Sequence, residues 1–339
     1  VLPHEHRVWA AAFMPDGEQL LTASGNADTP GTAQLWNAAT GERIGAPMRH
    51  ESMIREIAIS ADGRTLVTGS WTSHSAVRLW DAVTQSPISP PIPLVGGVTA
   101  VALDARGRTA VTASMGESFA QVWDLAVPSG EASLVSGELL TARFQLKHDS
   151  PVRSIAYSRD GQRILTGSYD GTARQWDAAT GEPISEPLRH RGQVGTVAFS
   201  RDTKFILTGT DEGHAQLWHA DSSRPAGSPL RHDGTVRGVA FSPNGQLLAT
   251  ASWDKTARLW HAATCKPVGP AMRHAGEVEG VPFSPDGRIV VSSSWDKTAR
   301  FWPVVLPVEA SVDKVALWVE TLTGMKLDSI EAAQVLDAG

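Results

Sequence analysis

Histidine, hydroxyl and carboxylate side chains recur together in this sequence, and such a set can hold a metal ion or activate a nucleophile in other proteins. His148, Thr166 and Asp170 form one set, and later segments repeat its spacing after His232 and His274. A catalytic or metal centre needs a single set, whereas this one returns about every 42 residues. The repetition therefore favours a structural unit over an active site.

Other patterns that carry chemistry are missing from the sequence. It contains no phosphate-binding Gly-rich loop, no dinucleotide fingerprint, no H-E-x-x-H and no G-x-S-x-G. The Asp-Gly turns have too few oxygens for calcium loops, and Cys265 stands alone without a reactive signature. The remaining histidines are scattered and are expected at the surface: His6, His74, His214, His219 and His261. The sequence thus predicts no enzyme, no cofactor and no metal site.

Tryptophan is unusually frequent in this sequence, which has 12 Trp, 8 Phe and 2 Tyr. Particular positions must therefore select it. Seven of these tryptophans end a similar sequence motif: Trp36, Trp80, Trp123, Trp176, Trp218, Trp260 and Trp302. Each phrase begins with a histidine, except that the third has Leu94. The units start near residues 4, 50, 94, 148, 190, 232 and 274. Together they predict one repeat array over residues 1–306.

Each unit reads as four short strands. In the fourth unit, VRSIAYS, RILTGS, ARQW and PISEPL are separated by turns with Asp-Gly or Thr-Gly. Such a small sheet can bury both faces only against copies of itself arranged in a ring. No segment before residue 310 has helical spacing over ten residues. We therefore expect an all-β, seven-bladed β-propeller.

The repeated phrases resemble those of the WD-repeat β-propeller family. They are GSYDGTARQWD (167–177), ASWDKTARLW (251–260) and SSWDKTARFW (293–302). With PLRH or PMRH before the strand, they are most similar to planctomycete-type bacterial WD-repeat proteins, including the C-terminal WD-repeat region of serine/threonine protein kinases.

The resemblance implies a buried hydrogen-bonded network of His, Ser or Thr, Asp and Trp in each blade. Its expected members are His148, Thr166, Asp170 and Trp176, then His232, Thr250, Asp254 and Trp260, then His274, Ser292, Asp296 and Trp302. Asp28 is the expected equivalent in the first blade, whereas His74, Glu117 and Glu212 replace the aspartate in the second, third and fifth. Blades 1 to 3 are expected to be less regular than blades 4 to 7.

The resemblance also implies a non-catalytic scaffold that binds protein or peptide partners on one face of the ring. Family positions near each His and Asp predict this face to contain Trp9, Arg55, Arg153, Tyr169, Arg237, Trp253, Glu277, Glu279 and Trp295. In the alternative, Trp253 and Trp295 are repeat residues that pack on neighbouring blades. Two other functions stay open: the regulatory or substrate-recruiting part of a serine/threonine kinase, and a propeller hydrolase or lyase using Glu277 and Glu279.

Composition restricts the partners. The net charge of −6 argues against a nucleic-acid or anionic membrane surface, and no apolar run approaches the roughly 20 residues of a membrane span. A single cysteine excludes an internal disulfide and suits a reducing, cytoplasmic location. We expect a monomer or a part of a larger chain.

The ends depart from the repeat. Residues 307–339 predict a helical tail, with Val312, Val315 and Val319 on one face and Trp318 as an anchor. At the other end, Val1–His4 resembles the last residues of the outermost strand of a blade. We expect most of that strand to be missing, Pro303–Val308 to replace it poorly, and the natural chain to begin earlier.

Overall fold

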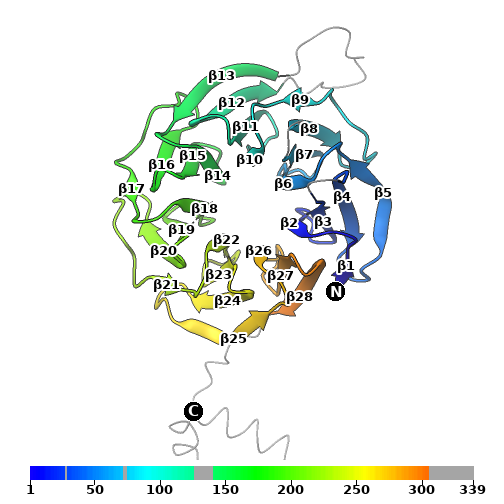
Figure 1. Ribbon diagram of the computed structural model, residues 1–339. Helices are drawn as coiled ribbons and strands as arrows, with labels where there is room; N and C mark the ends of the chain where they lie inside the picture. Colours follow the sequence, from blue (N-terminus) through cyan, green and yellow to red (C-terminus); the bar gives the residue numbers. More distant parts are fainter. Residues whose placement is uncertain (27–28, 72–74, 126–139, 305–339) are drawn as a thin grey trace, which may run out of the picture. The chain divides into compact units, whose positions relative to one another are not determined.

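The structure, a computed structural model, describes residues 1–26, 29–71, 75–125 and 140–304. They form seven four-stranded antiparallel sheets arranged as the blades of a ring (Figure 1). This confirms the all-β, seven-bladed β-propeller. The chain divides into a unit of residues 1–304 and a second unit of residues 305–339. The predicted tail helix and Trp318 lie outside the described residues, as do Asp28 and His74.

The strands follow one another from the channel outward in six of the blades. Blades 1 and 2 contain β2 (Val8–Phe13), β3 (Gln19–Ser24), β4 (Thr32–Asn37) and β5 (Arg43–Arg49), then β6 (Ile54–Ile59), β7 (Thr65–Ser70), β8 (Ala76–Asp81) and β9 (Ile92–Pro93). Blades 3 and 4 contain β10 (Val98–Leu103), β11 (Thr109–Ser114), β12 (Phe119–Leu125) and β13 (Leu140–Lys147), then β14 (Val152–Tyr157), β15 (Arg163–Ser168), β16 (Thr172–Asp177) and β17 (Leu188–Arg189). Blades 5 and 6 contain β18 (Val194–Phe199), β19 (Phe205–Thr210), β20 (His214–His219) and β21 (Leu230–Arg231), then β22 (Val236–Phe241), β23 (Leu247–Ser252), β24 (Thr256–His261) and β25 (Pro267–Arg273). Blade 7 contains β26 (Val278–Gly280), β27 (Ile289–Ser294), β28 (Thr298–Pro303) and, from the start of the chain, β1 (Leu2–Pro3).

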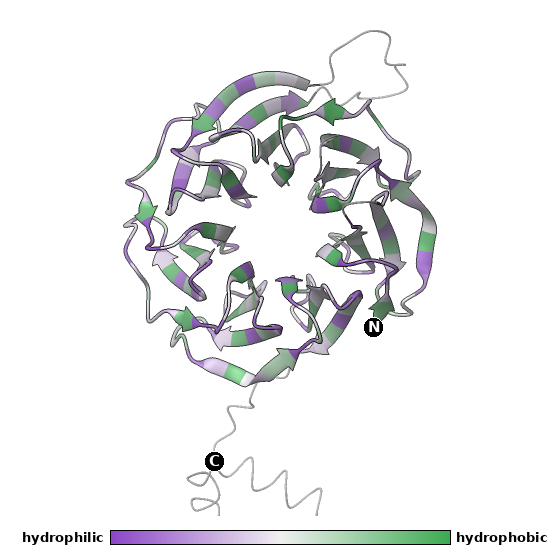
Figure 2. Cartoon of the chain, viewed as in Figure 1, coloured by the Kyte–Doolittle hydropathy of each residue, from purple (hydrophilic) through white to green (hydrophobic). Residues whose placement is uncertain are grey.

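Hydrophobic cores lie between neighbouring blades. Leu165 and Leu188 of blade 4 pack with Ile206 and Trp218 of blade 5, and all four are buried. Hydrophobic and hydrophilic residues alternate along the strands (Figure 2), as expected for sheets that pack face to face. Each blade is therefore stable only beside its neighbours.

The last blade is closed by the first residues of the chain. Leu2 pairs with Ala299 and Pro3 with Thr298, and Leu2 is buried beside Trp36 and Val291. Leu2 and Pro3 thus form the outermost strand of blade 7, as the likeness of Val1–His4 to the end of such a strand indicated. The outer strands of blades 2, 4 and 5 are also two residues long.

In blades 4 to 7 the turn after the second strand contains a residue in the left-handed conformation. Gly171 takes this place in blade 4 with φ of +78°, whereas Lys255 takes it in blade 6 with φ of +69°. A side chain is strained there and glycine is not. Replacing Lys255 with Gly should therefore raise the free energy of unfolding by about 0.5 kcal/mol in a urea titration.

The reverse change provides the control for this turn. Gly171→Lys should lower the stability, since its Cβ would also approach the carbonyl oxygen of His190 to 3.3 Å. A Lys255→Gly variant less stable than the parent would contradict the strain argument.

Candidate functional site

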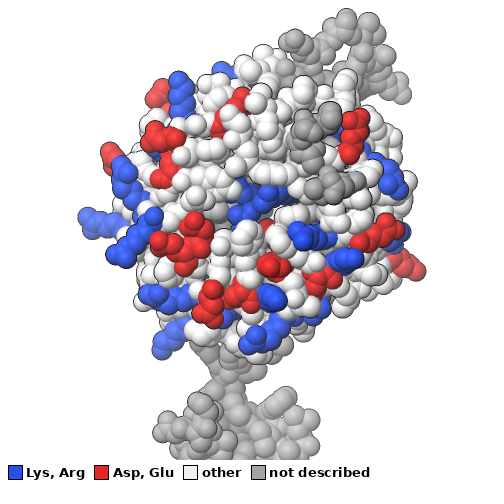
Figure 3. Space-filling view, in the orientation of Figure 1, with Lys and Arg blue, Asp and Glu red and all other residues white. Residues whose placement is uncertain are grey.

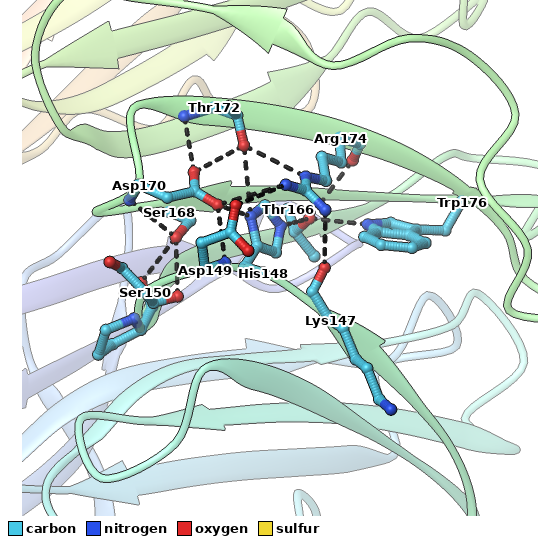
Figure 4. A network of polar contacts seen from close by, with 11 residues as sticks. Lys147, His148, Asp149, Ser150, Thr166, Ser168, Asp170, Thr172, Arg174 and Trp176 are labelled. Atoms are coloured by element: carbon cyan, nitrogen blue, oxygen red, sulfur yellow. Dashed lines mark hydrogen bonds and ion pairs between the residues drawn. The ribbon is translucent and has the colours of Figure 1, made fainter.

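The repeated histidine sets form closed hydrogen-bond chains in blades 4, 6 and 7. In blade 4 the indole Nε1–H of Trp176 donates to Thr166 Oγ1 over 2.8 Å. His148 Nε2 lies 2.7 Å from that hydroxyl, and His148 Nδ1 lies 2.8 Å from Asp170 Oδ2 (Figure 4). One tautomer satisfies every group: Thr166 donates to Nε2, and Nδ1–H donates to the carboxylate.

Two further blades repeat this geometry with their own residues. His232 bonds Asp254 at 2.8 Å and Thr250 at 2.7 Å, and Trp260 donates to Thr250. His274, Asp296, Ser292 and Trp302 do the same in blade 7. The three histidine side chains have no exposed surface, so they cannot meet a substrate. The sets hold the blades together.

The carboxylates of these sets are strongly favoured as anions. Burial alone would raise the pKa of Asp170, but hydrogen bonds from His148 and Thr172 lower it well below its ordinary value. Asp254 behaves in the same way with His232 and Thr256. The contribution of these groups to stability is lost only in strong acid, below the ordinary pKa of aspartate.

The remaining blades keep only parts of the network. In blade 5, Trp218 bonds Thr208 at 2.9 Å, but the buried Nε2 of His190 has no hydrogen-bond partner among the described residues. Blade 3 keeps the bond from Trp123 to Thr112. In blades 1 and 2, His4 contacts Thr22 and His50 contacts Thr68, as do Trp36 and Trp80 respectively.

These incomplete sets should make the fold sensitive to mild acid. Burial lowers the pKa of His50 to about 3 and those of His4 and His190 to about 4. At pH 5 the rings are neutral when folded, but mostly protonated at the ordinary value of 6.5 when unfolded. The unfolded chain then binds more protons, so stability is full above pH 7 and falls between pH 6.5 and 4.

We expect the loss at pH 5 to be about 2 kcal/mol for each of the three rings, measured by urea unfolding. His190→Asn, which removes one titrating ring, should reduce the slope by about a third. An unfolding free energy that stays flat between pH 7 and 5 would contradict this assignment.

The ring of innermost strands carries a second periodic set, made by β-bulges. In every blade the register shifts around the second residue of the innermost strand. A bulge leaves its extra residue unpaired and turns its side chain out of the ladder. We call these residues the bulge ring: Trp9, Arg55, Thr99, Arg153, Gly195, Arg237 and Glu279.

The bulges correct part of the predicted face. Sequence reasoning placed Arg153, Arg237 and Glu279 on the exposed surface, but their side chains are 7%, 6% and 5% exposed. They line the mouth of the central channel because the bulge directs them there. Trp253 is 38% exposed, and Trp9, Arg55, Tyr169, Glu277 and Trp295 are partly exposed.

Ion pairs connect the buried members of the bulge ring. Arg153 donates to Glu56 Oε1 at 3.0 Å and to the carbonyl oxygen of Thr99 at 2.7 Å, so it links blade 4 to blades 3 and 2. Glu56 was missed by sequence reasoning, although an acid on an innermost strand beside Arg55 was a signal for it.

Glu279 has both carboxylate oxygens occupied. Oε1 accepts the indole N–H of Trp253 at 2.9 Å, and Oε2 accepts from Arg237 Nε at 3.4 Å. The two bonds and the nearby arginines lower its pKa despite burial, which alone would raise it. A carboxylate held in this way is poorly suited to act as the free base of a channel hydrolase.

Tryptophan and arginine side chains alternate around the same mouth. Trp295 contacts Trp9 with ring centroids 5.3 Å apart and Trp253 with centroids 5.7 Å apart. Arginine side chains lie over the indoles: Arg7 over Trp295 at 4.2 Å, Arg237 over Trp253 at 5.1 Å, and Arg55 over Trp71 at 4.4 Å and Trp9 at 5.1 Å. We call Trp9, Trp71, Trp253 and Trp295 with these arginines the aromatic belt.

Three members of the belt, Trp9, Arg55 and Arg237, line a hollow of about 270 Å³ in the channel mouth. Basic side chains gather at the centre of this face (Figure 3). The four tryptophans do not close repeats, and three of them follow the second strand of their blades. Trp295 contacts Trp9 of blade 1 and Trp253 of blade 6, so these residues pack across blades as in the alternative for Trp253 and Trp295, yet Trp253 remains exposed.

A larger hollow of about 740 Å³ lies between blades 5 and 6, beside Phe205, Leu217 and Phe241. It includes turns after the first strands, which lie at the end of the blades opposite the belt. Its lining is mainly apolar and brings together no buried ion pair.

Among the described residues, no group of three or more His, Cys, Asp or Glu could hold a metal ion. In that same part of the chain, no helix is long and apolar enough to cross a membrane. Cys265 is buried, and burial raises the pKa of its thiol, which makes it unreactive.

Comparisons with known proteins agree with the architecture. A family model described as "WD domain, G-beta repeat" matches more than half of the chain, in residues 1–37, 42–81, 140–177, 181–219, 225–261 and 266–303. The matched segments leave out residues 82–139, which contain the first three strands of blade 3, the blade without its histidine.

Curated relatives match at low identity. Nuclear distribution protein PAC1-2 of Uncinocarpus reesii is 22% identical over 56% of this chain and 44% of its own length. A guanine nucleotide-binding protein subunit beta of Oryza sativa is 24% identical over 53% of this chain and 34% of its own. Serine-threonine kinase receptor-associated protein of Gallus gallus is 29% identical over the same shares. The chain thus spans less than half the length of these relatives.

Proposed function

Since the chain belongs to the WD40 repeat family, we propose that it is a non-catalytic scaffold that binds a protein or peptide partner at the aromatic belt. Propellers of this family typically serve as protein-interaction scaffolds. One observation supports the location: four of the five tryptophans outside the repeat-closing positions, all except Trp318 beyond the described residues, meet at one channel mouth, stacked with arginines. Trp and Arg dominate interface hot spots because they offer large contact areas and directed donors.

Truncation of the belt tests the proposal. Random peptides displayed on phage would be selected on the wild-type protein and then measured individually with Trp253→Ala/Trp295→Ala. We expect binding to fall by about 100-fold or more, because two adjacent hot-spot residues are lost. The melting temperature should drop by a few degrees only, since Trp253 is exposed.

The other hollow provides a matched control. Phe205→Ala/Phe241→Ala removes two aromatic rings from the lining between blades 5 and 6 and should leave peptide binding unchanged. Selected peptides that lose affinity in this variant, but not in the Trp253/Trp295 variant, would move the site to the opposite face.

We also propose that the scaffold belongs to a cytoplasmic bacterial signalling protein, with a serine/threonine kinase as the leading parent. The support is the resemblance of the SWDKTARLW phrases and of PLRH to those proteins. Sequencing the gene upstream of the Val1 codon tests it. An open frame with a Gly-rich loop, HRD and DFG is the expected result, and a frame without them would overturn the kinase assignment.

A further inference from the structure

The charges that line the channel mouth do not balance. The hollow is lined by Arg55, Arg153, Arg237, Glu56 and Glu279, which leave one positive charge in excess. Arg153 is paired with Glu56 and Arg237 with Glu279. Arg55 has no ion pair or hydrogen bond to its guanidinium in the described part of the chain, and its buried Nε has no partner.

Two indoles hold the unpaired guanidinium in place. The Cζ atom of Arg55 lies over Trp71 and Trp9. Trp71 in turn lies against Gly97, where any Cβ would collide with the indole ring. Stacking uses the faces of the guanidinium and leaves its N–H edges for a ligand. Burial and the neighbouring cations lower the pKa of Arg55 to about 9, so it remains charged at neutral pH.

A singly charged, planar hydrogen-bond acceptor would neutralise the excess positive charge of the hollow. An unpaired and partly buried cation is costly, and a carboxylate can relieve it with two parallel hydrogen bonds. A phosphate dianion would bring a second negative charge toward Glu56 and Glu279. The hollow of about 270 Å³ is below the usual range of ligand pockets, about 300–1,000 Å³, and suits a side chain better than a cofactor.

On the basis of the proposed function, we infer that the partner inserts the carboxylate of an aspartate or glutamate side chain into the channel mouth, where it pairs with Arg55. The aromatic belt extends over blades 1, 2, 6 and 7. A peptide that crosses the face along these rings presents a side chain, rather than its end, to the central hollow. The preformed, stacked guanidinium reduces the entropy lost on binding.

A capped glutamate, N-acetyl-glutamate N-methylamide, tests this inference without knowledge of the partner. In NMR titrations it should shift the Nε–H resonance of Arg55 and the indole resonances of Trp9 and Trp71. The corresponding capped glutamine, N-acetylglycine and inorganic phosphate should produce smaller shifts or none. Equal shifts from the capped glutamine, or stronger binding of N-acetylglycine or phosphate, would overturn the assignment to an acidic side chain.

Two variants separate Arg55 from the rest of the belt. Arg55→Met should abolish the NMR shifts caused by the capped glutamate. It should also lower the affinity for selected peptides that are acidic by about 30-fold. Arg43→Gln is the matched control, since Arg43 also stacks on an indole, that of Trp36, but is exposed and lies outside both the hollow and the aromatic belt. If selected peptides still require Trp253 and Trp295 but not Arg55, the proposed function stands and this inference fails.

Discussion

Replacing Arg153 with Met should destabilise the protein by about 3–5 kcal/mol, which is the usual cost of breaking a buried ion pair from one side. The change leaves Glu56 without its 3.0 Å partner and the carbonyl oxygen of Thr99 without its donor. Burial already raises the pKa of Glu56 against the pull of Arg153. Urea unfolding followed by tryptophan fluorescence measures the loss.

Two companion variants show whether the ion pair carries this effect. Glu56→Gln/Arg153→Met removes both charges and should recover more than half of the loss. Arg55→Met removes a neighbouring guanidinium that has no ion pair and should leave stability unchanged or higher. Equal destabilisation by Arg55→Met and Arg153→Met would show that arginine packing, rather than the ion pair, stabilises the channel mouth.

Replacing Thr250 with Val should cost about 3 kcal/mol, because a single hydroxyl serves two buried groups. Thr250 is fully buried, and its oxygen accepts from Trp260 Nε1 and donates to His232 Nε2. Valine keeps the shape but leaves both nitrogens without a partner. Thermal and urea unfolding at pH 7.5 measure the effect.

Blade 5 provides the control within the same protein. Thr208 serves Trp218 but not His190, whose Nε2 is already unpaired. Thr208→Val should therefore cost about 1–2 kcal/mol, the penalty of one unpaired buried group. A loss as large as that of Thr250→Val would mean that the histidine adds nothing to the network.

The fold could be predicted from the sequence because the same repeat unit occurs seven times. Each motif that ends in Trp defines the third strand of a blade, and each Asp-Gly turn separates two strands. The closure of blade 7 by Leu2 and Pro3 is less evident in the sequence, because it depends on the paired strand and on the core around Leu2.

The site could be predicted only in part. The positions of Trp9, Trp253 and Trp295 follow from the repeat, which indicated one face. The burial of Arg153 and Glu279 did not follow, because a β-bulge has no residue signature in these strands. Their ion pairs join residues far apart in the chain, such as Glu56 and Arg153, so no local pattern contains them.

Indole resonances of the tryptophans test the central claim, partner binding at the aromatic belt, most directly. A peptide selected on the wild-type protein would be titrated into ¹⁵N-labelled protein. We predict that the chemical shifts of the Nε1–H signals of Trp9, Trp71, Trp253 and Trp295 change, while those of the repeat-closing tryptophans do not. Shifts confined to Trp218 and Trp260, which belong to the cores of blades 5 and 6, would contradict it and place the partner at the larger hollow.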